Sequence, residues 1–390
     1  MTPRIYLDYN ATTPIHPEIL PLVISNLSKL GNPSSIHWAG REAKKIITQS
    51  RESIASLLHC DPLEIVFTSG GSEGNNLALK GAIDSSGTRN EIICSEVEHP
   101  SIIKTCEALE TRGFKVHWLK ISRDGEVDLE SLEKMLSEKT ALVTCQLVNN
   151  ETGNIFPLKK IARVAHQVGA LVHSDMVQAL GKIQVDLKAM DVDFATFAGH
   201  KFYALKGAGF LFVKKGTHVE PLIHGGGQER ARRAGTENAL AIASFGDAAR
   251  ILGPRIVEQN IRLEKMRDDL QDRILTEIPE SHVNGAKGKR VSNTLNVTFE
   301  NVDGETLLIN LDTKGIAISS GAACSSGSQE PSPVLTAMGL TPKEASQSLR
   351  VSLGWLTTQA EVDKFLETLC VAVSQIRKIV IEENIERELA

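Results

Sequence analysis

The 390-residue chain has 41% hydrophobic and 23% charged residues and a formal net charge of −5, from 43 Lys and Arg against 48 Asp and Glu. These values are close to those of globular proteins and the charges are spread along the chain, which argues against a nucleic-acid groove or a membrane-surface patch. No stretch reaches the roughly 20 apolar residues of a membrane span, and the first residues lack the apolar segment of a signal peptide. We therefore expect a soluble, cytoplasmic protein long enough for two domains.

From residue 41 to 213, helix-period segments alternate with short apolar runs, which is typical of a parallel sheet with crossover helices. A first helix is predicted over 41–60 and ends at Asp61-Pro62, and a later one begins at Pro157 and ends at Gly169. Strands are predicted between turn residues at 64–69, 91–95, 141–148, 171–175, 193–199 and 209–213.

Beyond residue 255 the pattern changes to a charged helix over 261–278, strands over 294–300 and 348–354, and an amphipathic helix over 359–380. This change predicts a second, α+β domain. We place the large domain at 15–255, and we assign 1–14 together with 256–390 to the small domain.

The cysteines are scattered, with no CxxC pair and no zinc-finger spacing, so we expect neither a disulfide framework nor a metal site. Five of them have apolar neighbours and are predicted to be buried thiols: Cys60, Cys94, Cys106, Cys145 and Cys370. Cys324 differs, because it lies in SSGAACSSGS, a segment rich in glycine and serine with no helix or strand pattern. Such a loop can move, and we interpret Cys324 as a nucleophile rather than a structural thiol.

Polar residues follow the predicted strands, where an open α/β sheet gathers its ligands. After 64–69, Gly70, Gly71 and Ser72 lead into a helix, so free backbone N–H groups could bind a phosphate, although such a sequence is also an ordinary turn. Asp175 ends one strand, Gln178 follows it, and His200-Lys201 end the next strand.

An acid and an amine at neighbouring strand ends suit pyridoxal phosphate (PLP). The acid keeps the ring nitrogen protonated and the lysine forms a Schiff base. Taken separately, Asp175 could be a helix cap and Lys201 a surface charge. The ordered combination of phosphate turn, acid and lysine favours the cofactor site.

Ten motifs together make the chain resemble the NifS/IscS-type cysteine desulfurases, which are PLP-dependent enzymes of the class-V aminotransferase-like group. The motifs are LDYNATTP (7–14), GNPSS (31–35), TSGGSEGNN (68–76), EHPSI (98–102), NNETG (149–153), HSDMVQ (173–178), GHKFY (199–203), GGGQERARRAGTEN (225–238), SSGAACSSGS (319–328) and LRVSLGW (349–355). The resemblance implies PLP fold type I, with a central, mostly parallel seven-stranded sheet and a smaller α+β domain. The segment around Cys324 is similar to that of the longer-loop group of the family.

The resemblance also implies roles for the residues around the cofactor. Lys201 would hold PLP and move protons at the substrate Cα, Asp175 would pair with the ring nitrogen, and Gln178 would hydrogen-bond the ring hydroxyl. His99 would stack on the ring as an acid/base group, although a histidine before a proline is otherwise a turn or surface residue. The phosphate would be bound by Gly71, Ser72, His200 and, from the partner subunit of a homodimer, Thr236.

For the substrate, the resemblance implies that Arg350 binds the carboxylate of L-cysteine, helped by Asn32 and by Asn150, which would also contact the cofactor. From the sequence alone, Arg350 could equally be the exposed end of a strand. Cys324 would attack the substrate sulfur, release alanine and carry a persulfide to an acceptor protein, for iron–sulfur cluster assembly or for thiolation of tRNA or DNA.

Three features depart from the family pattern: Ala198 replaces a serine that contacts the phosphate, Ala204-Leu205 replaces Gly-Pro and predicts a less rigid loop, and the C-terminal residues differ from those of the housekeeping members. Two alternatives stay open. One is a selenocysteine lyase or another class-V aminotransferase-like PLP enzyme, and the other is a non-catalytic sulfur-relay subunit.

Overall fold

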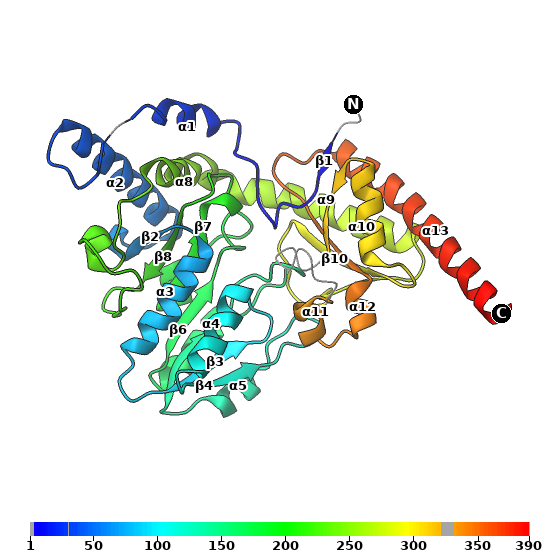
Figure 1. Ribbon diagram of the computed structural model, residues 1–390, viewed down its shortest axis with the longest axis horizontal. Helices are drawn as coiled ribbons and strands as arrows, with labels where there is room; N and C mark the ends of the chain where they lie inside the picture. The colour runs from blue at the N-terminus through cyan, green and yellow to red at the C-terminus, as the bar shows by residue number, and fades with distance from the viewer. Residues whose placement is uncertain (1–3, 30, 321–330, 390) are drawn as a thin grey trace.

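The computed structural model describes residues 4–29, 31–320 and 331–389. Its central feature is a seven-stranded sheet with the strand order β2-β8-β7-β6-β5-β3-β4 (Figure 1). Only β8 runs antiparallel to its neighbours in this sheet. The strands are β2 (Ile65–Thr68), β3 (Glu91–Ser95), β4 (Lys115–Leu119), β5 (Thr140–Thr144), β6 (Leu171–Asp175), β7 (Phe194–Ala198) and β8 (Gly209–Val213). The predicted mostly parallel sheet is confirmed, and β4 is the strand that the sequence pattern did not reveal.

Helices cover both faces of this sheet, so its strands are apolar on both sides. Neighbouring residues point to opposite faces: Ile92 packs in the core under α3 and α4, whereas Ile93 packs in the core that includes α2, α6 and α8. Figure 1 shows α3 and α4 in front of the sheet and α2 beside α8. The helices of this part are α1 (Leu20–Asn26), α2 (Trp38–Leu58), α3 (Gly71–Asp84), α4 (Pro100–Glu110), α5 (Leu129–Met135), α6 (Leu158–Gln167), α7 (Leu187–Met190) and α8 (Ala239–Leu252).

The rest of the chain builds a smaller α+β part around the antiparallel sheet β12-β13-β10-β9. Its strands are β9 (Ser281–Val283), β10 (Thr294–Phe299), β12 (Ser319–Ser320) and β13 (Ser348–Ser352). Its helices are α9 (Ile256–Glu277), α10 (Gly304–Thr313), α11 (Pro333–Ala337), α12 (Pro342–Ser346) and α13 (Gln359–Leu389). The start of the chain joins this part, because β1 (Ile5–Tyr6) pairs in parallel with β11 (Ile316–Ala317). Figure 1 shows α9 passing from one part to the other.

The thiols outside segment 321–330 differ in burial. Cys94, Cys106 and Cys145 are buried as predicted, whereas Cys60 and Cys370 are only partly buried, so for these two the prediction is wrong. Both lie near the ends or outer faces of helices rather than in a central strand: Cys60 just follows α2, and Cys370 lies on α13. No helix in the described ranges is long and apolar enough to cross a membrane. Within the same ranges, no group of His, Cys, Asp and Glu side chains could hold a metal ion.

Candidate active site

The predicted site residues of the large part meet at one edge of the seven-stranded sheet. Strands β2, β3, β5, β6 and β7 are mutually parallel, so their carboxyl ends lie on the same side. These ends lead to Gly71 and Ser72 after β2, His99 after β3, Asn150 after β5, Asp175 and Gln178 at the end of β6, and His200 and Lys201 after β7. Residues far apart in the sequence are thereby brought to one site.

Asp175 is a buried carboxylate with neutral hydrogen-bond donors. Its side chain is held by Asn75 Nδ2, which donates to Oδ2 over 2.7 Å, and by Val177 N, which donates to Oδ1 over 2.9 Å. The residue is 7% exposed. A buried carboxylate is costly unless it is paired, and each of its oxygens can accept a further hydrogen bond. These properties fit a cationic ring N–H as the partner.

Lys201 contacts the N-terminal segment of the chain. Its Nζ donates to the backbone oxygens of Asn10 and Ala11, each at 2.6 Å, and further interactions hold the residue as well. Gln178 Nε2 donates to the same Asn10 oxygen over 2.9 Å. The amine of Lys201 and the amide of Gln178 therefore lie side by side. The sequence contained this feature in the motif LDYNATTP, but no role for Asn10 was predicted from it.

His99 caps α4: its Nδ1 accepts from Ser101 N over 3.1 Å and lies 2.8 Å from Ser101 Oγ. Ser101 Oγ also accepts from Asn75, the residue that holds Asp175. His99 is thus connected to Asp175 through two neutral side chains. The same network places it at the carboxyl edge of the sheet, beside Asp175.

Glu98, beside His99, is a buried acid that the sequence did not single out. Its Oε1 accepts from Ser95 Oγ over 2.5 Å and from Gln146 N over 2.7 Å, which ties the loop after β3 to the loop after β5. Burial raises the pKa of Glu98 to about 8, against an ordinary value of 4.5. The side chain is therefore mostly protonated at neutral pH.

We expect Glu98 to make the free energy of unfolding depend on pH. Because its pKa is higher in the folded than in the unfolded chain, the unfolded chain binds fewer protons between about pH 4.5 and 8, and stability falls as the pH rises through this range. Glu98→Gln stays neutral and should be more stable than the wild type at pH 8.5, by roughly 2–4 kcal/mol, but not at pH 4.5. Urea unfolding at both pH values measures this difference.

The control for this prediction is Glu126→Gln, since Glu126 is exposed. It should follow the wild type at both pH values. An equal stability of Glu98→Gln and wild type at pH 8.5 would contradict the proposed burial effect.

The turn after β2 fits an anion. Helix α3 begins after Gly70 without a side-chain cap for its first N–H groups, and a Cβ added at Gly70 would meet no atom within 4 Å, so there is open space beside the start of the helix. A Cβ at Gly71 would lie 2.9 Å from Val177 Cγ2, so the turn packs directly on the loop after Asp175. The site thus offers backbone donors beside the carboxylate that suits a ring nitrogen.

His200 is held near this turn by Thr12, whose Oγ1 lies 3.1 Å from its Nδ1. Burial, together with the charges of Lys201 and Lys206, lowers the pKa of His200 to about 4. At neutral pH the imidazole is therefore uncharged in this structure and offers one N–H donor to an anion.

The two departures next to Lys201 have different structural consequences. Ala198 is buried at the end of β7 and provides no hydroxyl at that point. Ala204 is buried and donates from its backbone N to Gly199 O, and Leu205 N donates to Ser244 Oγ over 3.0 Å. The loop that was expected to be less rigid is thus anchored by hydrogen bonds on both residues.

Arg350 is buried, 1% exposed, and is not the exposed strand end that the sequence left open. Its Nη2 donates to Asp8 Oδ1 over 2.6 Å, and its Nη1 donates to Asn150 O over 3.1 Å. Its Nε is buried and has no hydrogen-bond partner in the described part of the chain. A guanidinium with an unsatisfied, buried N–H fits a carboxylate ligand, because planar N–H pairs bind carboxylates bidentately.

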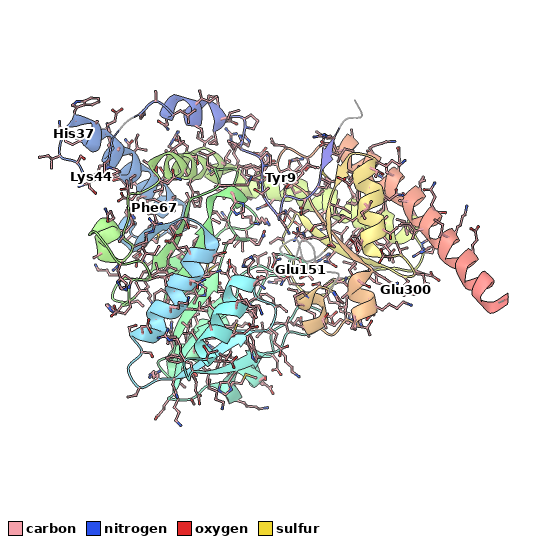
Figure 2. The ribbon with its side chains drawn as sticks, in the orientation of Figure 1. Tyr9, His37, Lys44, Phe67, Glu151 and Glu300 are labelled. Atoms are coloured by element: carbon pink, nitrogen blue, oxygen red, sulfur yellow. The ribbon has the colours of Figure 1, made fainter. Side chains whose placement is uncertain are left out.

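The Arg350 region also borders the segment that carries Cys324, which itself lies outside the described residues. Ser319, in the strand that leads into segment 321–330, is paired with Arg350 in the small sheet. On the other side, Ser332 Oγ donates to the buried Glu151 Oε2 over 2.5 Å. Figure 2 shows Glu151 between the two parts of the molecule. The chain therefore enters and leaves segment 321–330 close to Arg350 and Asn150.

Two predicted residues are not brought into this site within one chain. Asn32 is exposed, and its Oδ1 accepts from Ser34 N in its own loop. Figure 2 shows His37, at the start of α2, on the outer edge of the molecule, away from Glu151. Thr236 is exposed too. The family resemblance implied that Thr236 acts from a second subunit, and its exposure is compatible with that role.

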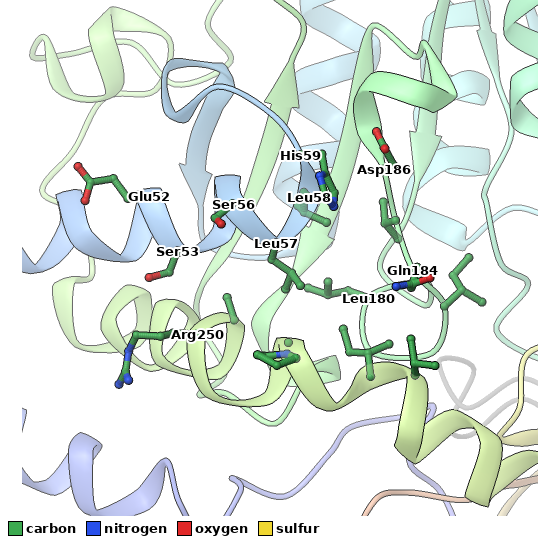
Figure 3. A pocket seen from close by; sticks show the side chains of 17 residues that line it. Glu52, Ser53, Ser56, Leu57, Leu58, His59, Leu180, Gln184, Asp186 and Arg250 are labelled. Atoms are coloured by element: carbon green, nitrogen blue, oxygen red, sulfur yellow. The ribbon is translucent and has the colours of Figure 1, made fainter.

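The large surface cavity shown in Figure 3 is a different feature. It has a volume of about 740 Å³ and lies between α2, the loop after Leu180 and the junction of α8 with α9. None of the predicted site residues lines it. A narrow cavity beside Lys201, lined also by Lys182, Thr13 and Asn293, borders the site.

Comparison with known proteins finds relatives that match nearly the whole chain. Over 376 residues, 96% of this chain and 94% of the relative, the sequence is 42% identical to a protein of Trichormus azollae named cysteine desulfurase. A solved NifS-like protein is similar with a TM-score of 0.89 and 36% identity, over 95% of this chain and all of that one. SspA, solved in complex with cysteine, is similar with a TM-score of 0.79 and 34% identity, over 90% of this chain and 98% of that one. Since the model of the aminotransferase class-V family matches residues 5–365, the chain belongs to that family.

Proposed function

We propose that the protein is a PLP-dependent cysteine desulfurase that forms L-alanine from L-cysteine and carries the sulfur as a persulfide on Cys324. The observation that carries the proposal is the position of Arg350. Its Nε has no partner among the described residues, and it lies where the chain enters and leaves the Cys324 segment, beside Asn150. The relatives named cysteine desulfurase and the cysteine-bound SspA support cysteine as the substrate.

The residues at the sheet edge fit PLP. Asp175 would hold the proton on the ring nitrogen, Lys201 would hold the aldehyde carbon, and Gln178 would donate to the ring oxygen. Gly71, Ser72 and His200 would bind the phosphate, and His99 would lie on the ring face. When bound, PLP supplies an electron sink that weakens the bonds at the substrate Cα and Cβ.

The chain's own residues then perform the transfer. Arg350 and Asn150 orient the substrate through its carboxylate, and Lys201 removes the proton from Cα, with His99 as a second acid/base group. The Cys324 thiolate attacks the substrate Sγ. A sulfur–sulfur bond forms as the Cβ–Sγ bond breaks, and protonation of the carbon skeleton completes alanine.

The experiment that tests this function measures alanine and sulfide from L-cysteine in the presence of a reducing thiol. We expect Cys324→Ala to lower sulfide release at least about a hundredfold while the cofactor absorbance stays unchanged. Cys370→Ala is the matched control, because that thiol lies on α13 beside Glu277, and it should behave as the wild type. Full turnover by Cys324→Ser, or a wild type that neither binds PLP nor forms alanine, would overturn the proposal.

The proposed active unit is a homodimer in which Thr236 of each subunit completes the phosphate site of the other. The exposure of Thr236 supports this proposal. Exposed apolar residues near the start of the chain, which a second subunit would cover, support it too: Ile24, Leu27, Ile36 and Trp38. The persulfide would pass to an acceptor protein. The free thiols of the described ranges suit the reducing cytoplasm, where we propose that the protein acts.

We also propose that residues 15–255 form the large domain and that residues 1–14 and 256–390 together form the small domain. Its support is a separate buried core in the small part, built from α9, α10, α13 and the small sheet. Residues of α11 and α12 are the exception, because Val334, Leu335 and Ala345 pack on the core of the large part.

A further inference from the structure

Lys182 is a buried lysine next to the site that neither the sequence motifs nor the proposed mechanism uses. It is 9% exposed and forms no ion pair with a carboxylate in the described part of the chain. Lysine is rarely buried without such a partner, because the loss of hydration is costly. The charged groups that face it are Lys201, from the turn after β7, and Arg350, from β13, and both oppose a further positive charge.

The turn before Lys182 is built for this position. Gly181 has a φ of +84°, and a Cβ there would lie 2.5 Å from the ring of Phe202. Only glycine fits, so the backbone is fixed where Lys182 begins. From this turn, Lys182 Nζ donates to Asn10 Oδ1 over 2.6 Å and to Gln178 Oε1.

These contacts determine which way two side-chain amides face. Asn10 Nδ2 donates to the backbone oxygen of Asn150 over 3.0 Å, so its oxygen must be the end that faces Lys182. Gln178 has the same arrangement: its nitrogen faces the backbone oxygen of Asn10, and its oxygen faces Lys182. A backbone oxygen only accepts, and the amine here donates, so each amide has one orientation that satisfies both of its ends.

We propose that Lys182 is a positioning residue that fixes the Gln178 amide with its N–H groups toward Lys201 and the ring oxygen of the cofactor. One N–H of Gln178 bonds the Asn10 oxygen that also accepts from Lys201, and the other N–H would be left to donate to the ring oxygen of the cofactor. This inference rests on the proposed function. It adds a residue that acts through Gln178 and Asn10 rather than by touching the cofactor.

The expected effect is a change in the pH at which a proton is lost from the bound cofactor. That proton would be shared between Lys201 Nζ and the ring oxygen of PLP. An N–H donated to that oxygen stabilises its negative charge and lets the proton leave at lower pH. In Lys182→Met the Gln178 amide loses the donor that holds its oxygen. The pH midpoint of the visible absorption band should then rise by about one unit, and the affinity of the apoprotein for PLP should fall about tenfold.

The experiment compares Lys182→Met, Lys182→Gln, Gln178→Met and the double variants in a cycle, with Lys188→Met as control, because Lys188 is exposed on α7. Lys182→Gln keeps an amide donor and should shift the midpoint less than Lys182→Met. If Lys182 acts through Gln178, the shifts of the single variants are not additive in the double variant. Should Lys182→Met fail to fold, the cycle with Lys182→Gln decides.

An unchanged midpoint and PLP affinity in a folded Lys182 variant, or additive shifts, would overturn the inference and leave the proposed function standing. A wild type without an absorption band would instead count against the proposed function. The readouts are absorbance and PLP affinity, so neither result depends on turnover.

Discussion

Lys201→Ala is expected to lower the rate of alanine formation from L-cysteine by about a thousandfold or more and to abolish covalent attachment of PLP. Lys201 lies in the turn after β7, where its amine donates to the Asn10 and Ala11 oxygens. Loss of a positioned proton-transfer group alone costs about 10²–10⁴ in rate. The other amine nearby, Lys182, is tied to Asn10 and Gln178 and should not substitute.

The measurement is single-turnover alanine formation with PLP in excess, together with mass spectrometry after borohydride reduction. Lys206→Ala is the control, because Lys206 lies on the same loop but is exposed. It should retain both activity and the reduced adduct. A Lys201→Ala protein with more than a few per cent of wild-type turnover would show that another group moves the Cα proton.

Arg350→Ala is expected to raise KM for cysteine at least about a hundredfold and also to destabilise the protein. Arg350 is buried against Asp8, and removal of one partner of a buried ion pair typically costs about 3–5 kcal/mol because the remaining charge is unpaired. Arg350→Lys separates the two effects. It keeps a charge for Asp8, but it loses the planar pair of N–H groups that can bind two carboxylate oxygens.

We therefore expect Arg350→Lys to keep most of the thermal stability while KM stays at least about tenfold above wild type. Cysteamine, which is cysteine without the carboxylate, provides the matched comparison. The wild type should prefer cysteine to cysteamine strongly, and Arg350→Lys should lose most of that preference. An unchanged preference would mean that the carboxylate binds elsewhere.

The positions of six of the seven strands of the large sheet followed from short apolar runs between turn residues, and three of them, β3, β6 and β8, have the predicted bounds. Strand β4 was missed because its sequence, KVHWL, is partly exposed and mixes charged with apolar residues at the edge of the sheet. The segment predicted as a strand over 141–148 ends as a strand at Thr144, because the following residues leave the sheet to form the loop that reaches Asn150.

The contacts of the N-terminal segment were not predictable in the same way. Asp8 lies 342 residues from Arg350, and Asn10 lies 172 residues from Lys182. No local periodicity encodes such pairs, because they exist only after the two parts of the molecule have packed together. The sequence did contain a sign that Lys182 is buried, because this lysine interrupts an apolar stretch between Leu180-Gly181 and Ile183.

The sequence by itself determined most strands of the large sheet, several helices and the polar residues at the strand ends, because hydrophobic periodicity and turn residues act locally. From these it followed that Asp175 and Lys201 share one edge of the sheet. Only the tertiary structure decided that Arg350 is buried on Asp8, that Asn32 stays on the outer surface, and that Asn10 connects Lys201 with Gln178 and Lys182. Those outcomes depend on which distant backbone and side-chain groups satisfy each other once water is excluded, and that is a property of the packed molecule.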